Sequence, residues 1–233
     1  MKKTTAAAMI ILLAGLMLCH TSERKGYLMI VGGGDKPMDA MQAFVDHCQG
    51  KPVVIITSAS SDLEYGNFTA GNRLGGTGAE KALNRLYYER GGIIGGTSAG
   101  AAAMSEVMIT GNELVNKDST NIFHSIQAKN VETKRGFGFI KNAIIDQHFM
   151  MRKRHNRLIA VVLEHPELPG IGIDEEAAIL VYPDGRFKVY GKDAVIVYDA
   201  RKAKEIRVSD QGLLGGRNIK VDLLLPGEVY SIE

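Results

Sequence analysis

The feature that most constrains this chain is a glycine-flanked serine between an apolar run and a helix-forming run. Residues 92–94, Gly-Ile-Ile, lead into residues 95–101, Gly-Gly-Thr-Ser-Ala-Gly-Ala, and small helix-forming residues follow. The order of strand, tight turn and helix, with Ser98 at the apex, fits the G-x-S-x-G nucleophile elbow. A strained turn of this kind needs neighbours nearly free of side chains, here Gly96 and Gly100. The following helix N-terminus would direct N–H dipoles at charge that develops near Ser98. The segment therefore predicts a nucleophilic serine, and the alternative is an ordinary glycine-rich turn.

The first 22 residues have the pattern of a signal peptide. Lys2 and Lys3 precede an apolar run from Ala6 to Leu18 that holds no charge. Such a run is short for a membrane span and typical of a signal-peptide core, although a retained anchor is the alternative. We expect residues 1–22 to be removed, no stable membrane span afterwards, and a secreted or periplasmic domain over residues 23–233. Lipidation at Cys19 is disfavoured, because Leu18 stands where a lipoprotein signal has a small residue.

The charge balance argues against a general nucleic-acid binder. Two of the 28 basic residues lie in residues 1–22, which leaves 26 basic against 26 acidic residues. Nucleic-acid binding domains usually carry a basic excess. Cys48 is the one cysteine after the signal segment, so the domain cannot form an intrachain disulfide.

The order of apolar runs predicts an α/β fold. Residues 27–31 and 52–57 resemble buried parallel strands, and residues 38–48 between them have helical spacing, which gives a βαβ unit. Later residues that resemble strands are joined by tight turns, notably Pro183-Asp184-Gly185. The further expected strands are 67–69, 92–94, 143–146, 172–174, 178–182, 186–190 and 194–198, and the expected helices 79–90 and 154–164. We expect a mostly parallel sheet with an antiparallel C-terminal extension.

Three glycines, Gly32 to Gly34, follow the first expected strand, where a phosphate-binding loop would lie. The stretch lacks the spacing of dinucleotide-binding and P-loop motifs, which argues against nucleotide binding. The other interpretation is that these glycines let the backbone approach the catalytic turn. We expect no cofactor and no metal site.

A nucleophilic serine needs a base, and the base needs a group that orients it. His148 follows the expected strand 143–146, at the carboxyl end where open α/β sheets place their sites. The orienting acid would come from Asp174 or Glu175, at the end of another expected strand. These residues alone do not choose between the two.

Arginines follow the candidate base at short intervals, at Arg152, Arg154 and Arg157. Guanidinium groups bind carboxylates through paired hydrogen bonds, so this run indicates an acidic substrate. The alternative is a solvated basic helix start.

Three motifs together resemble the cyanophycinase branch of the S51 serine peptidases, to which aspartyl dipeptidase also belongs. They are Gly-Gly-Thr-Ser-Ala-Gly-Ala (95–101), Asp-Gln-His-Phe with the spaced arginines (146–157) and Gly-Ile-Asp-Glu (172–175). The resemblance implies a flavodoxin-like sheet that has helices on both faces, as in class I glutamine amidotransferases. It also implies that the protein forms a homodimer. It implies Ser98 as nucleophile, His148 as base and Glu175 as orienting acid. It also implies substrate-binding roles for Asp146, Gln147, Arg152, Arg154 and Arg157.

The implied function is a serine-type exopeptidase that acts at aspartyl residues, on a β-aspartyl-arginine polymer or on aspartyl or isoaspartyl peptides. We expect the oxyanion to be bound by the N–H of Ala99 and by a glycine N–H, from Gly71 or from the Gly32–Gly34 turn.

The chain departs from the family pattern between Asp62 and Asn72. The family's Thr-Gly-Gly-Asp-Gln type segment has no glutamine counterpart here, and the region from Ser61 to Asn67 is shortened. We count Asn72 among the expected substrate-binding residues. The shortening leaves a second interpretation open, a non-catalytic S51-like protein that binds acidic peptides. A glutaminase is less favoured, because that class usually has cysteine at the elbow.

Overall fold

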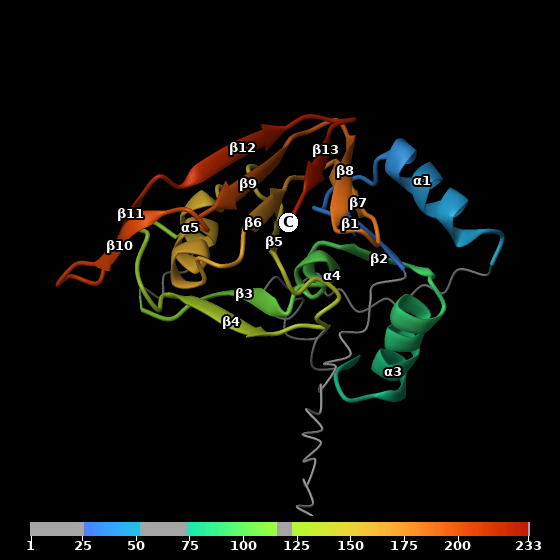
Figure 1. Cartoon of the computed structure of the whole chain (residues 1–233), viewed down its shortest axis with the longest axis horizontal. Coiled ribbons are helices and arrows are strands. Elements are labelled where there is room, and N and C mark those ends of the chain that lie inside the picture. Colours follow the sequence, from blue (N-terminus) through green and yellow to red (C-terminus); the bar gives the residue numbers. More distant parts are fainter. Residues whose placement is uncertain (1–25, 52–73, 116–122, 233) are drawn as a thin grey trace, which may run out of the picture.

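Two mixed β-sheets form the framework of the fold (Figure 1). A computed structural model describes residues 26–51, 74–115 and 123–232. Its elements, in chain order, are β1 (Tyr27–Val31), α1 (Met38–Cys48), α3 (Gly78–Asn84), the π-helix η1 (Arg85–Glu89), β2 (Ile93–Thr97), α4 (Ala99–Ala102), β3 (Val107–Glu113), β4 (Val131–Arg135), β5 (Ile144–Gln147), α5 (His155–Glu164), β6 (Gly170–Ile173), β7 (Ala177–Val181), β8 (Arg186–Gly191), β9 (Val195–Asp199), β10 (Lys204–Val208), β11 (Leu214–Arg217), β12 (Lys220–Leu224) and β13 (Val229–Ser231).

The strand order of the larger sheet is β13-β8-β7-β1-β2, and that of the other is β12-β9-β6-β5. Two hairpins, β3–β4 and β10–β11, complete the described strands. Within the described residues, β1 pairs in parallel with β2, and β5 pairs in parallel with β6. The other strand pairs are antiparallel.

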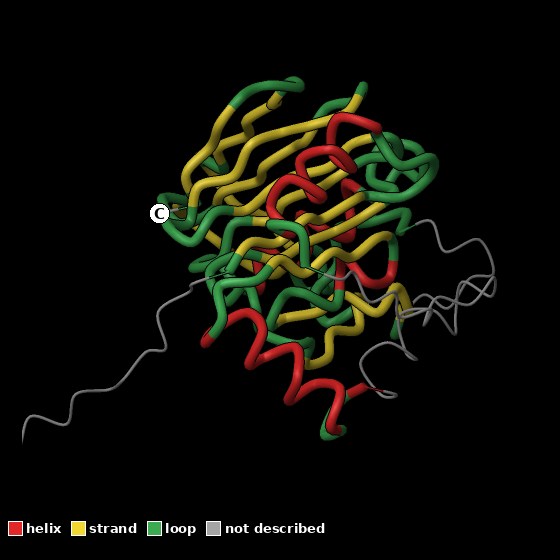
Figure 2. The backbone as a smooth tube through the Cα atoms, turned by 90° about the vertical axis from the view of Figure 1, so that its right-hand side faces the viewer, coloured by secondary structure: helices red, strands yellow, loops and turns green. Residues whose placement is uncertain are grey.

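Alternation along the strands divides the interior into layers. In β1, Leu28 and Ile30 join a core that also takes side chains from β6, β7, β8 and β9, so one face of each sheet shares it. The other face of β1, with Met29 and Val31, packs with residues of α1. On the second sheet, Ile196 of β9 faces α5 and the β3–β4 hairpin. Figure 2 shows helical segments beside the strands of the two sheets and a further helix below them.

Most expected elements are present close to their expected bounds. The strand 27–31 and the helix 38–48 have the bounds expected. The helix expected over 79–90 is α3 followed by a π-helical turn. The expected strands 52–57 and 67–69, and the signal segment 1–22, lie outside the described residues. No helix within 26–51, 74–115 and 123–232 is long and apolar enough to cross a membrane.

The mixed α/β prediction is confirmed, but the described strands are not mostly parallel. The reason lies in β7, which inserts beside β1 in antiparallel register, Leu28 opposite Val181. The chain then reverses through a tight turn, where Tyr182 N–H donates to Arg186 O at 2.8 Å, so β8 also runs antiparallel. An uninterrupted apolar run such as that of β7 indicates burial on both faces and does not report strand direction.

Candidate active site

Ser98 lies at the turn between β2 and α4, as the elbow motif predicts. Its backbone is strained, with a positive φ of 53° and a ψ of −119°. A Cβ at Gly96 would lie 2.5 Å from the carbonyl oxygen of Gly100, so the strand and helix approach closely only because residue 96 has no side chain. A Cβ at Gly100 would meet no described atom within 4 Å, so the second glycine of the motif is not explained by a clash.

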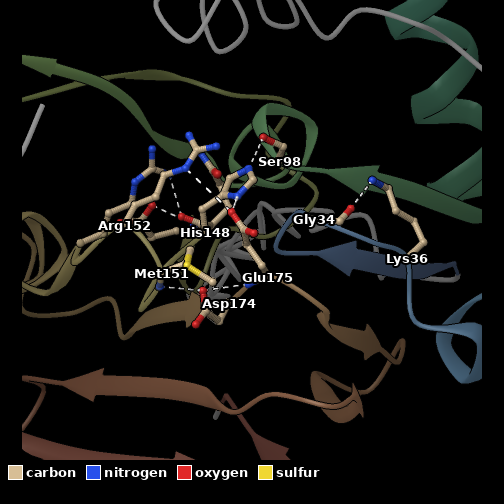
Figure 3. A network of polar contacts seen from close by, with 11 residues as sticks. Gly34, Lys36, Ser98, His148, Met151, Arg152, Asp174 and Glu175 are labelled. Atoms are coloured by element: carbon tan, nitrogen blue, oxygen red, sulfur yellow. Dashed lines mark hydrogen bonds and ion pairs between the residues drawn. The ribbon is translucent and has the colours of Figure 1, made fainter. Parts of the chain in front are cut away.

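The structure brings Ser98, His148 and Glu175 into one hydrogen-bonded chain (Figure 3). The Oγ of Ser98 is 2.8 Å from Nε2 of His148, and Nδ1 of His148 is 2.5 Å from Oε1 of Glu175. An ionised carboxylate only accepts hydrogen bonds, so Nδ1 carries the proton and Nε2 is left to accept from the serine hydroxyl. This is the arrangement that general-base activation of a serine requires.

The imidazole of His148 is buried and lies among charged groups. Burial is the main cause that lowers the pKa of His148, and the hydrogen bond to Glu175 opposes it. The guanidinium groups of Arg152 and Arg154 lower the same pKa further. The neutral imidazole, which can act as a base, is therefore favoured.

The geometry separates the two acids that the sequence left as alternatives. Glu175 contacts the imidazole, whereas Oδ1 of Asp174 accepts the backbone N–H groups of Met151 at 3.0 Å and Glu175 at 2.8 Å. The side chain of Asp174 is buried and binds backbone, so Glu175 is the acid placed to orient His148.

The glycine turn after β1 lies directly against the Ser98–His148–Glu175 chain. A Cβ at Gly33 would lie 2.2 Å from Cε1 of His148, and one at Gly34 would lie 3.1 Å from Cβ of Glu175. The carbonyl oxygen of Gly32 accepts the N–H of His148 at 3.0 Å. This contact agrees with the interpretation that the glycines let the backbone approach the catalytic turn.

The arginines do not act as one group. Arg152 is one-third exposed, and its Nε lies 4.0 Å from Oε1 of Glu175, so its side chain reaches the site. Arg154 is partly buried and donates from Nη1 to the carbonyl oxygen of Gln147 at 2.7 Å. Burial, ahead of repulsion from Arg157, lowers the pKa of Arg154 to about 9, and the group stays protonated at neutral pH. The Oε1 atom of Gln147 is buried and has no hydrogen-bond partner among the described residues.

Asp146 and Arg157, which were expected to bind substrate, are paired with each other in the structure. Nε of Arg157 donates to Oδ2 of Asp146 at 2.8 Å, and Nη2 donates to Oδ1. The side chains are 2% and 0% exposed, so neither is open to a substrate.

Comparison with known proteins gives this geometry its context. The model of Peptidase family S51 matches residues 66–189, more than half of the chain. The chain belongs to peptidase family S51. A cyanophycinase from Synechococcus elongatus is 31% identical over 156 residues, covering 64% of this chain and 45% of that protein. A cyanophycinase from Trichormus variabilis is 34% identical over 148 residues, covering 61% and 47%. The chain spans about half the length of the curated relatives it matches.

A solved structure gives the same result at the level of the fold. The crystal structure of a peptidase from an acI-B1 Actinobacterium superposes with a TM-score of 0.54 at 16% identity, over 90% of this chain and 98% of that chain. At this identity the likeness concerns the fold alone.

The N–H groups of Ala99 and Gly71 were expected to bind the oxyanion. Ala99 is the first residue of α4, so its N–H has no acceptor inside the helix and lies next to Ser98. Gly71 and the substrate-binding candidate Asn72 lie outside the described residues. No cluster of three or more metal-ligating side chains occurs in the part of the chain that the structure describes.

One feature of the site was not expected from the sequence: Asp174 accepts hydrogen bonds from two backbone N–H groups. A signal was present, because an aspartate directly after a strand and before the orienting acid is well placed to accept nearby backbone donors.

Proposed function

We propose that this S51 member is a serine-type hydrolase that cleaves peptide bonds next to aspartyl residues, in line with its similarity to cyanophycinases. The observation that carries the proposal is the unbroken hydrogen-bonded chain from Ser98 through His148 to Glu175. The elbow motif alone fits many strand-to-helix turns, whereas a serine with a base and an oriented acid fits acyl transfer.

In this proposal the Oγ of Ser98 attacks the carbonyl carbon of the scissile bond while Nε2 of His148 takes the hydroxyl proton. The charge that develops on the carbonyl oxygen is stabilised by the N–H of Ala99 and the dipole of α4. The imidazolium then gives its proton to the leaving amine, and a water molecule repeats the sequence on the acyl-enzyme. Glu175 stabilises the imidazolium throughout.

The preference for an acidic substrate is proposed from the arginine side chains that lie next to Ser98, His148 and Glu175. Arg152 is exposed at the site and is the guanidinium closest to Glu175, so it is the first candidate to bind a substrate carboxylate. Arg154 lies behind it as a second positive charge, tied to the backbone of Gln147. A β-aspartyl-arginine polymer and aspartyl or isoaspartyl peptides all offer such a carboxylate. Secretion and a homodimer belong to the same proposal.

The test is a substrate panel with the purified chain. It compares a β-aspartyl-arginine polymer, an isoaspartyl dipeptide, an α-aspartyl dipeptide and a matched asparaginyl dipeptide. We expect turnover of at least one aspartyl substrate and loss of roughly 10⁴- to 10⁶-fold in Ser98→Ala. Ser231→Ala, an exposed serine on β13, is the control and should keep full activity.

The opposite results are equally clear. Near-normal hydrolysis by Ser98→Ala would contradict a serine mechanism. Binding of aspartyl peptides by the wild-type chain without any turnover would instead favour the non-catalytic alternative.

A further inference from the structure

A second buried carboxylate stands next to the orienting acid and has a different set of partners. Asp174 directly follows β6, and its side chain is buried, with 4% of the residue exposed. Its Oδ1 accepts the N–H of Met151 at 3.0 Å and the N–H of Glu175 at 2.8 Å, and both bonds are drawn in Figure 3. The first bond reaches a segment that is distant in the sequence, and the second is made within the turn of Asp174 itself.

These two segments carry the base and its acid. Met151 belongs to the loop that runs from His148 to the start of α5, and Glu175 belongs to the turn between β6 and β7. The N–H of Phe149 also donates to Ile173 O, but at 3.3 Å this is a longer contact than either bond to Asp174. Asp174 and Glu175 are neighbours in the chain, so the bond that crosses between the loop and the turn is the one from Met151, and it is shorter than the contact from Phe149.

Both segments need such support, because their backbones are strained. His148 has φ 47° and Lys153 has φ 53°, while Glu176, next to Glu175, has φ 54°. Non-glycine residues occupy this region at a cost and persist only where the surrounding structure holds them. A carboxylate that accepts two N–H groups can stabilise such backbone conformations, since hydrogen bonds to an ionised acceptor are stronger than those between neutral groups.

We propose that Asp174 is a positioning residue, which holds the loop after His148 against the turn of Glu175 so that the imidazole and its orienting acid stay in contact. The inference rests on the proposed function for its catalytic meaning, but its structural content can be measured without any substrate. It also explains why two adjacent acids are present when only one contacts the imidazole.

The experiment compares Asp174→Ala, Asp174→Asn, Glu175→Gln and the double variant Asp174→Ala/Glu175→Gln with the wild-type chain. Glu113→Gln is the matched control, a buried acid on β3 that accepts from Asn130. Two quantities are measured. The first is the pKa of His148, by NMR titration of the imidazole Cε1–H. The second is the rate at which a fluorophosphonate probe modifies Ser98, which needs no natural substrate.

The charged groups that act on the imidazole are Glu175, Arg152 and Arg154. The hydrogen bond to Glu175 raises the pKa of His148, and loss of Asp174 should weaken that contact. Asp174→Ala should therefore lower the pKa of His148, and Glu175→Gln should lower it as well. Misplacement by about 1 Å can cost a hundredfold in rate, and we expect a decrease of about this size in probe labelling. Asp174→Asn keeps an acceptor oxygen without the charge, so its labelling rate should lie between those of wild type and Asp174→Ala.

The double variant separates positioning from the bare charge of Asp174. If Asp174 acts through Glu175, its removal in the Glu175→Gln background should change neither the pKa of His148 nor the labelling rate much further. A purely electrostatic effect of Asp174 on the imidazole would persist in that background and would overturn the inference. The inference would also be overturned if Asp174→Ala lowered the melting temperature but left the pKa of His148 and the labelling rate of Ser98 unchanged. That is the pattern expected of Glu113→Gln.

Two complications are decided by the same measurements. If Asp174→Ala does not fold, Asp174→Asn carries the test, and a folded Asp174→Asn with unchanged pKa and labelling rate overturns the inference. If the wild-type chain neither reacts with the probe nor hydrolyses any peptide, the proposed function fails. The NMR comparison then still decides whether Asp174 holds His148 and Glu175 together.

Discussion

Gly33 leaves the space that the imidazole of His148 occupies, because it has no side chain. The sequence left its glycine run open to two interpretations, a phosphate loop or a close approach of backbone. The structure places Gly33 against the imidazole of His148, with φ +140°, a conformation that side-chain-bearing residues rarely adopt. The position thus has two reasons to be glycine, one local and one imposed by the site.

We expect Gly33→Ala to lose hydrolysis of an aspartyl substrate by about a hundredfold or more, because the new Cβ would displace the imidazole. Gly50→Ala is the matched control. Gly50 also has a positive φ, +71°, but a Cβ there meets no described atom within 4 Å. It should cost some stability and leave kcat/KM intact. Equal loss of activity in both variants would contradict a specific role for the contact between Gly33 and His148.

The ionisation of His148 sets the low-pH limit of the proposed activity. Burial lowers the pKa of His148, and the charge of Arg152 lowers it further, so the acid limb of kcat/KM should lie below about pH 6.5. A nearby positive charge disfavours the imidazolium. Its removal in Arg152→Ala should raise the pKa of His148 and move the acid limb to higher pH.

Arg152→Lys is the informative comparison, measured as a pH profile of kcat/KM. It keeps the positive charge, so the acid limb should stay in place. The planar fork that binds a carboxylate is lost, so kcat/KM for an aspartyl substrate should still decrease. An acid limb that does not move in Arg152→Ala would show that this charge does not reach the imidazole.

The end of β5 and the first turn of α5 are joined by a buried ion pair. Asp146 and Arg157 meet through two hydrogen bonds and are almost fully buried. Removal of one partner leaves an uncompensated buried charge, which typically costs about 3–5 kcal/mol. We therefore expect Arg157→Ala to lower the free energy of unfolding by about that amount in urea denaturation.

The exposed Arg152 provides the comparison for this measurement. Arg152→Ala should leave the urea midpoint nearly unchanged, since its side chain is one-third exposed and 4.0 Å from Glu175. If Arg157→Ala were as stable as the wild type and lost only the binding of acidic substrates, the buried pair would not be structural.

The sequence could have separated these arginines, but only through the helix that follows. Most of α5 from Arg157 onward is buried, and Arg157, Leu158, Val161 and Val162 have the spacing of one helix face; Ala160 and Leu163 are buried as well. Arg157 thus lies on the apolar face, whereas Arg152 precedes the helix. Spacing between arginines alone carries no information on which of them turns inward.

The strands themselves were predictable from their apolar runs, and their pairing was not. Residues 27–31 and 186–190 are strands in the structure as expected. β7, however, pairs with β1 and β8, and its own apolar residues do not indicate which strands will be its neighbours. Pairing depends on the whole chain, because it is decided by which arrangement buries every strand together.

The candidate site exists only where the two sheets meet. Ser98 follows β2 and the glycine turn follows β1, both in the five-stranded sheet, while His148 follows β5 and Asp174 follows β6, both in the four-stranded sheet. The N–H of His148 donates to Gly32 O across this junction. The motifs predicted which residues form the candidate site, since each motif lies at a strand end. The junction between the sheets, which brings these residues together, depends on the packing of distant segments and was not predicted.

The positive φ angles at Ser98 and His148 have a consequence for how the molecule responds to heat. Residues held in such conformations cost about 1–3 kcal/mol each, and here the serine and its base both occupy them. We expect these two turns to lose their geometry at a lower temperature than the strands that precede them, β2 and β5. The activity of this chain should fade at temperatures where circular dichroism still records an intact fold, and it should return on cooling.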